Sequence, residues 1–109
     1  MARVLSTHAH LAVQLLGTEI AQGRRERRLS VEDLARRAGV SPVTARAVEH
    51  GSPSVSVGTV FELAVLTGVP LFTLDADELS LRLVASRDRL ALLPKRVRQR
   101  AETGVSLDF

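Results

Sequence analysis

The chain has 109 residues, of which 45% are hydrophobic, a composition that predicts a single small domain with its own core. It contains no cysteine, which excludes disulfide bonds and zinc sites built on thiolates. The formal net charge is +3, and all but one of the 15 basic residues are Arg. Residues 1–51 carry eight Arg against five acids, whereas residues 52–93 carry three against five. The first half is therefore suited to phosphates and the middle to protein contacts.

The hydrophobic pattern near the N-terminus predicts a helix. Ser6 or Thr7 can begin a helix that runs to about Arg27, because apolar side chains recur at intervals of three and four residues. Those positions are Ala9, Val13, Leu16 and Ile20. The apolar stretch over residues 10–16 is too short and too polar for a membrane span or a signal peptide. We therefore expect a cytoplasmic protein.

Two short helices follow, separated by a glycine. Ser30 can cap a helix over residues 31–38, and Gly39 can end it in the left-handed conformation. Ser41 can cap the next helix, whose first position suits Pro42 and which ends at Gly51. This spacing is typical of a helix-turn-helix that binds DNA, although a helical hairpin inside a small bundle would need the same caps.

The second half carries two more predicted helices. One covers about residues 57–67, and Pro70 opens a further turn of helix through Phe72. Asp75 can cap the last helix, which ends before Pro94. Its apolar stripe is wider than one small domain covers, so we expect it both to close the core and to form a twofold dimer interface. The stripe comprises Leu79, Leu83, Leu90 and Leu93.

From Leu16 to about Leu74 the chain resembles the lambda-repressor-like, Cro/XRE-type helix-turn-helix family. The resemblance lies in LSVEDLARRAGVS, then VEHG, then an amphipathic helix ending in LTGVPL. It implies an all-α, five-helix DNA-binding fold that acts as a transcriptional repressor. The expected organisation is an N-terminal helical extension (1–15), the DNA-binding domain (16–74), a C-terminal dimerisation helix (75–93) and a basic tail (94–109).

The resemblance implies that residues 42–47 enter the major groove of double-stranded DNA, with Ser30 and Ser41 holding phosphates. This chain departs from the polar pattern usual in the family, because Pro42, Val43 and Ala47 leave few hydrogen-bonding groups. Core packing is the alternative role for Val43 and Ala47, and it is the one we favour for Ala47. For Arg46 we favour contact with DNA over a solvated face. The full candidate set is Ser30, Val31, Ser41, Pro42, Val43, Thr44, Arg46, Ala47 and His50.

The resemblance also implies a structural ion pair. In this family an Arg late in the first helix meets a Glu near the end of the recognition helix, and Arg24 and Glu49 stand in the matching register. Such a pair would fix how the recognition helix sits on the domain.

The end of the chain indicates protein partners. Its segment LLPKRVRQR and the short acidic-aromatic end resemble the HipB-like antitoxins that accompany HipA-type kinase toxins. Leu107 and Phe109 could enter a pocket on a toxin or on a second protomer. We expect an autoregulating, antitoxin-type dimer. The alternative is an interaction module that neutralises a partner, with DNA binding secondary.

No catalytic constellation, metal site or cofactor site is evident, so we do not expect an enzyme.

Overall fold

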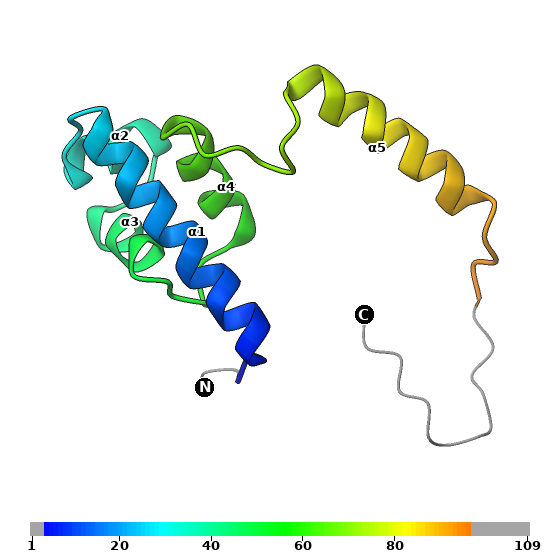
Figure 1. Cartoon of the computed structure of the whole chain (residues 1–109), viewed down its shortest axis with the longest axis horizontal. Coiled ribbons are helices and arrows are strands. Elements are labelled where there is room, and N and C mark those ends of the chain that lie inside the picture. The colour runs from blue at the N-terminus through cyan, green and yellow to red at the C-terminus, as the bar shows by residue number, and fades with distance from the viewer. Residues whose placement is uncertain (1–3, 97–109) are drawn as a thin grey trace. The chain divides into compact units, whose positions relative to one another are not determined.

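The computed structural model describes residues 4–96, and within that range it contains five helices and no strand. The helices are α1 (Thr7–Glu26), α2 (Val31–Ala38), α3 (Pro42–Glu49), α4 (Val57–Leu66) and α5 (Ala76–Ala91) (Figure 1). This confirms the expected all-α class. Contacts divide the chain between Asp75 and Ala76 into two units, which are described separately. No helix among the described residues is long and apolar enough to cross a membrane.

Each of the first four helices begins after a serine. The hydroxyl groups of Ser6, Ser30, Ser41 and Ser56 each accept a hydrogen bond from the backbone amide three residues later, at 3.0–3.4 Å. These bonds satisfy amide groups that have no partner within the helix. The helix starts are therefore set locally by the sequence, and the caps predicted at Ser30 and Ser41 are confirmed. Of the two expected starts of the first helix, Ser6 and Thr7, the structure has Ser6 as the cap.

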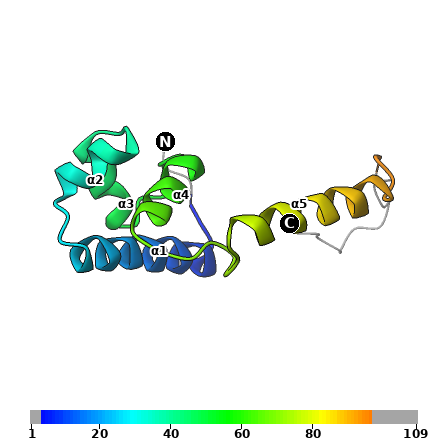
Figure 2. The ribbon, with the colours of Figure 1, turned by 90° about the horizontal axis from the view of Figure 1, so that it is seen from above.

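The first unit is a bundle of α1 to α4 around one apolar core. Figure 2 shows α1 along one side of this unit, with α2, α3 and α4 on the other. Helix α1 contacts α3 and α4, and α2 contacts the same two helices. The core consists of Ile20, Leu34, Val48, Leu63, Ala64 and Val69. One buried side chain or more from each of the four helices therefore holds the bundle together.

Two buried glycines let α1 approach its neighbours closely. A Cβ atom at Gly17 would clash with the backbone carbonyl oxygen of Val48 at the end of α3. A Cβ at Gly23 would clash with the carbonyl oxygen of Thr67, whose own hydroxyl is buried and donates to the carbonyl of Leu63 at 2.7 Å. Backbone atoms cannot move aside as a flexible side chain can. These two positions thus fix the distance of α1 from α3 and from the end of α4.

The turn of helix expected at Pro70 to Phe72 is wrong. The chain instead forms a bend and a turn there, in which Phe72 and Thr73 have φ angles of 58° and 56°. This left-handed conformation cannot continue a right-handed helix. The Phe72 ring packs edge-on against Phe61 of α4, with ring centroids 6.3 Å apart.

In the second unit, α5 is the one helix among the described residues. The expectation that its leucine stripe closes the core stays a prediction. Leu90 is 68% exposed and Leu83 is 49% exposed, while Leu79 is half-buried. Leu93 lies two residues beyond the last helical residue. The buried core of the first unit comes from α1 to α4 and from Val69, which follows α4.

Candidate DNA-binding surface

The turn between α2 and α3 is built on Gly39. Its φ of 73° places it in the left-handed region, and the amides of Gly39 and Val40 donate to the carbonyls of Arg36 and Ala35 at 3.2 and 3.0 Å. This motif ends α2 and redirects the chain within two residues. Ser41 then caps α3, and its hydroxyl lies 3.0 Å from that of Thr44. The two helices contact each other along the faces that carry Leu34, Ala45 and Val48.

Helix α3 has one face in the core and one in solvent. Ala45 is fully buried and Val48 is 3% exposed, whereas Val43 is 73% exposed and Arg46 is also exposed. The remaining candidates on α3, Pro42, Thr44 and Ala47, are half-buried. Because most of the Val43 side chain is exposed, a ligand can contact it. A helix of this diameter fits the major groove of DNA.

The first turn of α2 is strongly acidic. Ser30 is exposed and Val31 is half-buried, and Glu32 and Asp33 follow directly. Hydrogen bonding by Ser30, and secondarily by Arg36, lowers the pKa of Asp33 because it favours the ionised carboxylate. Two carboxylates in one helical turn repel a phosphate. The start of α2 therefore carries negative charge beside the Ser30 cap, whereas the first turn of α3 contains no acidic residue.

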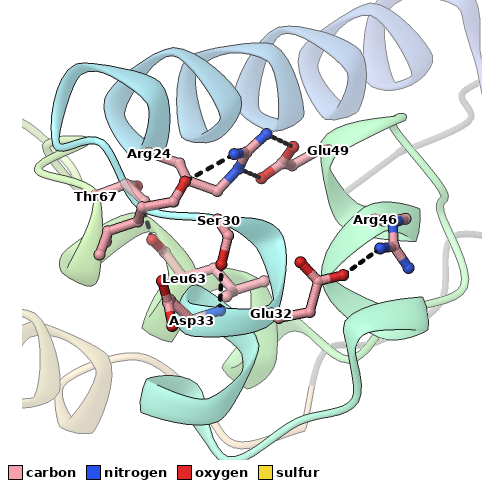
Figure 3. A network of polar contacts seen from close by, with 9 residues as sticks. Arg24, Ser30, Glu32, Asp33, Arg46, Glu49, Leu63 and Thr67 are labelled. Carbon is pink, nitrogen blue, oxygen red and sulfur yellow. Dashed lines mark hydrogen bonds and ion pairs between the residues drawn. The ribbon is translucent and has the colours of Figure 1, made fainter.

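An exposed ion pair joins the two helices of the motif. The Arg46 guanidinium donates to a carboxylate oxygen of Glu32 at 2.5 Å, and both side chains are about half exposed, at 49% and 58% (Figure 3). Glu32 thus holds the cation expected to meet DNA. Exposed pairs of this kind contribute little stability, about 0 to 1 kcal/mol. The guanidinium can therefore exchange Glu32 for a phosphate or a base edge at small cost.

The structure brings Arg24 and Glu49 together. Arg24 Nε donates to Glu49 Oε2 at 2.7 Å and Nη2 donates to Oε1 at 3.1 Å, while Nη1 donates to the carbonyl oxygen of Leu29 at 2.9 Å (Figure 3). The side chains are 11% and 8% exposed. Hydrogen bonding to Glu49 raises the pKa of Arg24, although burial acts in the opposite direction. The bidentate pair ties α1 to the end of α3 and also anchors the loop before α2.

His50 is the C-cap residue of α3. Its backbone amide donates to the carbonyl of Arg46 at 3.0 Å, and the residue is exposed. Gly51 follows with a φ of 81°, which takes the chain away from the helix axis. His50 therefore stands at the opposite end of α3 from Ser41.

Two groups of this surface were missed by sequence reasoning. Glu32 lies 14 residues before Arg46, on a different helix, so no helical spacing rule connects them. The Leu29 carbonyl is a backbone group, and side-chain patterns do not report such acceptors. A signal existed for Glu32 only in its place on the first turn of α2, beside the predicted interface.

The arrangement of α2, α3 and the turn between them defines a helix-turn-helix DNA-binding domain. A family model described as helix-turn-helix matches residues 20–74, which is half of the chain, so the chain belongs to the Cro/XRE-type helix-turn-helix family. The protein is accordingly a DNA-binding transcriptional regulator. No curated protein and no solved structure gave a significant match to the chain.

Proposed function

We propose that the protein is a sequence-specific transcriptional repressor that binds operator DNA as a homodimer through the exposed face of α3. The observation that carries this proposal is the exposure of Val43 and Arg46 on the helix that follows the Gly39 turn. A dimer reads two half-sites, separated by about 34–36 Å along the DNA, and so gains specificity that one short helix lacks. The protein would act in the cytoplasm, on the nucleoid.

Base recognition by α3 would combine one apolar and one charged contact. The methyl groups of Val43 suit a thymine methyl group, whereas Arg46 suits a guanine edge or a phosphate. The Thr44 hydroxyl, next to Ser41, can hydrogen-bond a phosphate. Ala47 and Pro42 are half-buried and contribute to the shape of the surface that would meet the DNA. With so few hydrogen-bonding groups, operator selection would depend on thymine methyl groups and on DNA shape more than on bidentate contacts.

We further propose that the repressor regulates its own operon as an antitoxin and binds a HipA-type toxin encoded beside it. The support is the resemblance of LLPKRVRQR and the chain end to HipB-like antitoxins. Residues 97–109, which include Arg98, Arg100, Leu107 and Phe109, lie outside the described residues. Copurification of the adjacent gene product with the full chain, and loss of that product on deleting residues 97–109, would support the antitoxin role.

The pair of Arg46 and Glu32 predicts opposite effects of two substitutions on DNA affinity. We expect Arg46→Ala to weaken operator binding about tenfold or more, because it removes a cation from the interface. We expect Glu32→Gln to strengthen binding about two- to fivefold, because it releases Arg46 and removes a charge that repels phosphates. Fluorescence anisotropy with labelled operator DNA measures both affinities.

The matched control for Arg46→Ala is Arg37→Ala, which removes the same charge from an exposed position in the last turn of α2. Affinity should fall less for Arg37→Ala than for Arg46→Ala. Circular dichroism would verify that all three variants fold. Unchanged affinity in a folded Arg46→Ala protein would remove Arg46 from the interface, and weaker binding by Glu32→Gln would show that Glu32 supports the complex.

A further inference from the structure

Helix α5 has 16 residues and is the one helix of its unit among the described residues. That unit therefore offers its large apolar side chains, Leu79, Leu83 and Leu90 among them, no second described helix to pack against. A single helix of this length is only marginally stable in water. A helix of this composition is therefore expected to be stabilised by packing against a partner.

The partner face can be read from the spacing. Leu79, Leu83, Ser86 and Leu90 follow one another at intervals of four, three and four residues, which is the seam of a two-helix coiled coil. Ala76 lies three residues before Leu79 and therefore extends the seam toward the start of the helix. Leu81 lies on the opposite face of the helix, because two residues rotate the chain by about 200°. The seam thus has apolar residues at every position except Ser86.

Charge along α5 distinguishes the two orientations of a helix pair. Asp77 and Glu78 lie in its first turn, whereas Arg87 and Arg89 lie near its end with Asp88 between them. A parallel pair would place acid beside acid and base beside base. An antiparallel pair places the acidic start of each helix beside the basic end of the other, and the opposed helix dipoles also attract.

We propose that α5 forms an antiparallel coiled coil with α5 of a second copy of this chain. In this register Leu79 packs against Leu90 of the second copy, and Leu83 packs against its Ser86. The twofold axis passes between residues 84 and 85. Arg82 lies beside a basic residue of the second copy in both the parallel and the antiparallel pair, so it favours neither orientation. The inference rests on the homodimer of the proposed function and gives that homodimer its interface and geometry.

The absence of cysteine from the chain allows a direct test of the register. Leu79→Cys and Leu90→Cys variants, one carrying an affinity tag that changes its mass, are oxidised separately and as a mixture. The antiparallel register predicts a disulfide only in the mixture, between the tagged and untagged chains. A disulfide dimer of Leu79→Cys alone would show a parallel pair. Absence of any disulfide would also overturn the proposal.

A second measurement does not depend on a disulfide. Leu83→Gln removes a seam residue, and Leu81→Gln makes the same change on the opposite face of the same helix. Sedimentation should show the dimer dissociation constant raised about tenfold or more for Leu83→Gln, but changed less than about threefold for Leu81→Gln. Equal effects would contradict the interface.

The two proposals fail separately. If Leu83→Gln leaves the dimer intact while Arg46→Ala still weakens DNA binding, the α5 pairing is wrong and the DNA-binding proposal stands. If Leu83→Gln dissociates the dimer while the full chain binds no operator, the pairing stands and the repressor proposal is wrong.

Discussion

Replacing Glu49 with Ala is expected to lower the free energy of unfolding by about 2 to 4 kcal/mol. This loss is smaller than for a fully buried ion pair, because the side chains of the pair keep some contact with solvent. The change leaves the guanidinium of Arg24, whose side chain is only 11% exposed, without its carboxylate partner. Arg24→Ala should lower the free energy of unfolding by a similar amount, since it also removes the hydrogen bond to the carbonyl oxygen of Leu29. Chemical denaturation followed by circular dichroism measures these changes.

The double variant Arg24→Ala, Glu49→Ala should lose less stability than the two single losses added together, because it leaves neither buried charge without its ionic partner. The matched control is the same cycle on Arg46 and Glu32, whose side chains are about half exposed. There we expect a coupling of at most about 1 kcal/mol. Additive losses at Arg24 and Glu49 would show that the pair does not act as a unit.

A methyl group at position 17 is the second change with a large expected effect. Gly17→Ala places its Cβ against the carbonyl oxygens of Val48 and Glu49, which belong to the backbone of α3. Because α1 and α3 must separate, we expect a loss of about 2 to 3 kcal/mol. For a domain of this size the melting temperature should fall by roughly 10 °C or more.

Gly58→Ala is the control for this prediction. Gly58 also lies within a helix, α4, but a Cβ there would meet no heavy atom within 4 Å. The substitution should be neutral or stabilising by up to about 1 kcal/mol, because Ala favours the helix more than Gly does. Similar stabilities of Gly17→Ala and Gly58→Ala would mean that α1 does not need the close contact with α3.

The helix starts could be predicted from sequence because their determinants are local. Ser30 and Ser41 lie within three residues of the amides that they cap, and Gly39 adopts the conformation that its missing Cβ permits. The same reasoning failed at Phe72, where a turn of helix was expected, because a left-handed φ angle is rare for a residue of this type.

The candidate site divides in the same way. Arg24 and Glu49 could be proposed from the register of the resemblance, and the structure places their side chains within hydrogen-bonding distance. The Glu32 partner of Arg46 could not be proposed, since it depends on how two helices cross. The role of α5 stays a prediction, because amphipathic spacing does not distinguish a stripe that enters the core of its own chain from one that packs against a second chain.

Binding of operator DNA by α3 can be tested with a salt titration. Anisotropy would be measured for DNA from the region upstream of the protein's own gene and for a shuffled sequence of equal length. We predict tighter binding to the upstream DNA and a log-log salt slope of about −0.9 for each phosphate neutralised, with more than one such contact per protomer. Equal affinity for both sequences would rule out specific binding to the upstream DNA, and binding that does not weaken with salt would rule out contacts with phosphates.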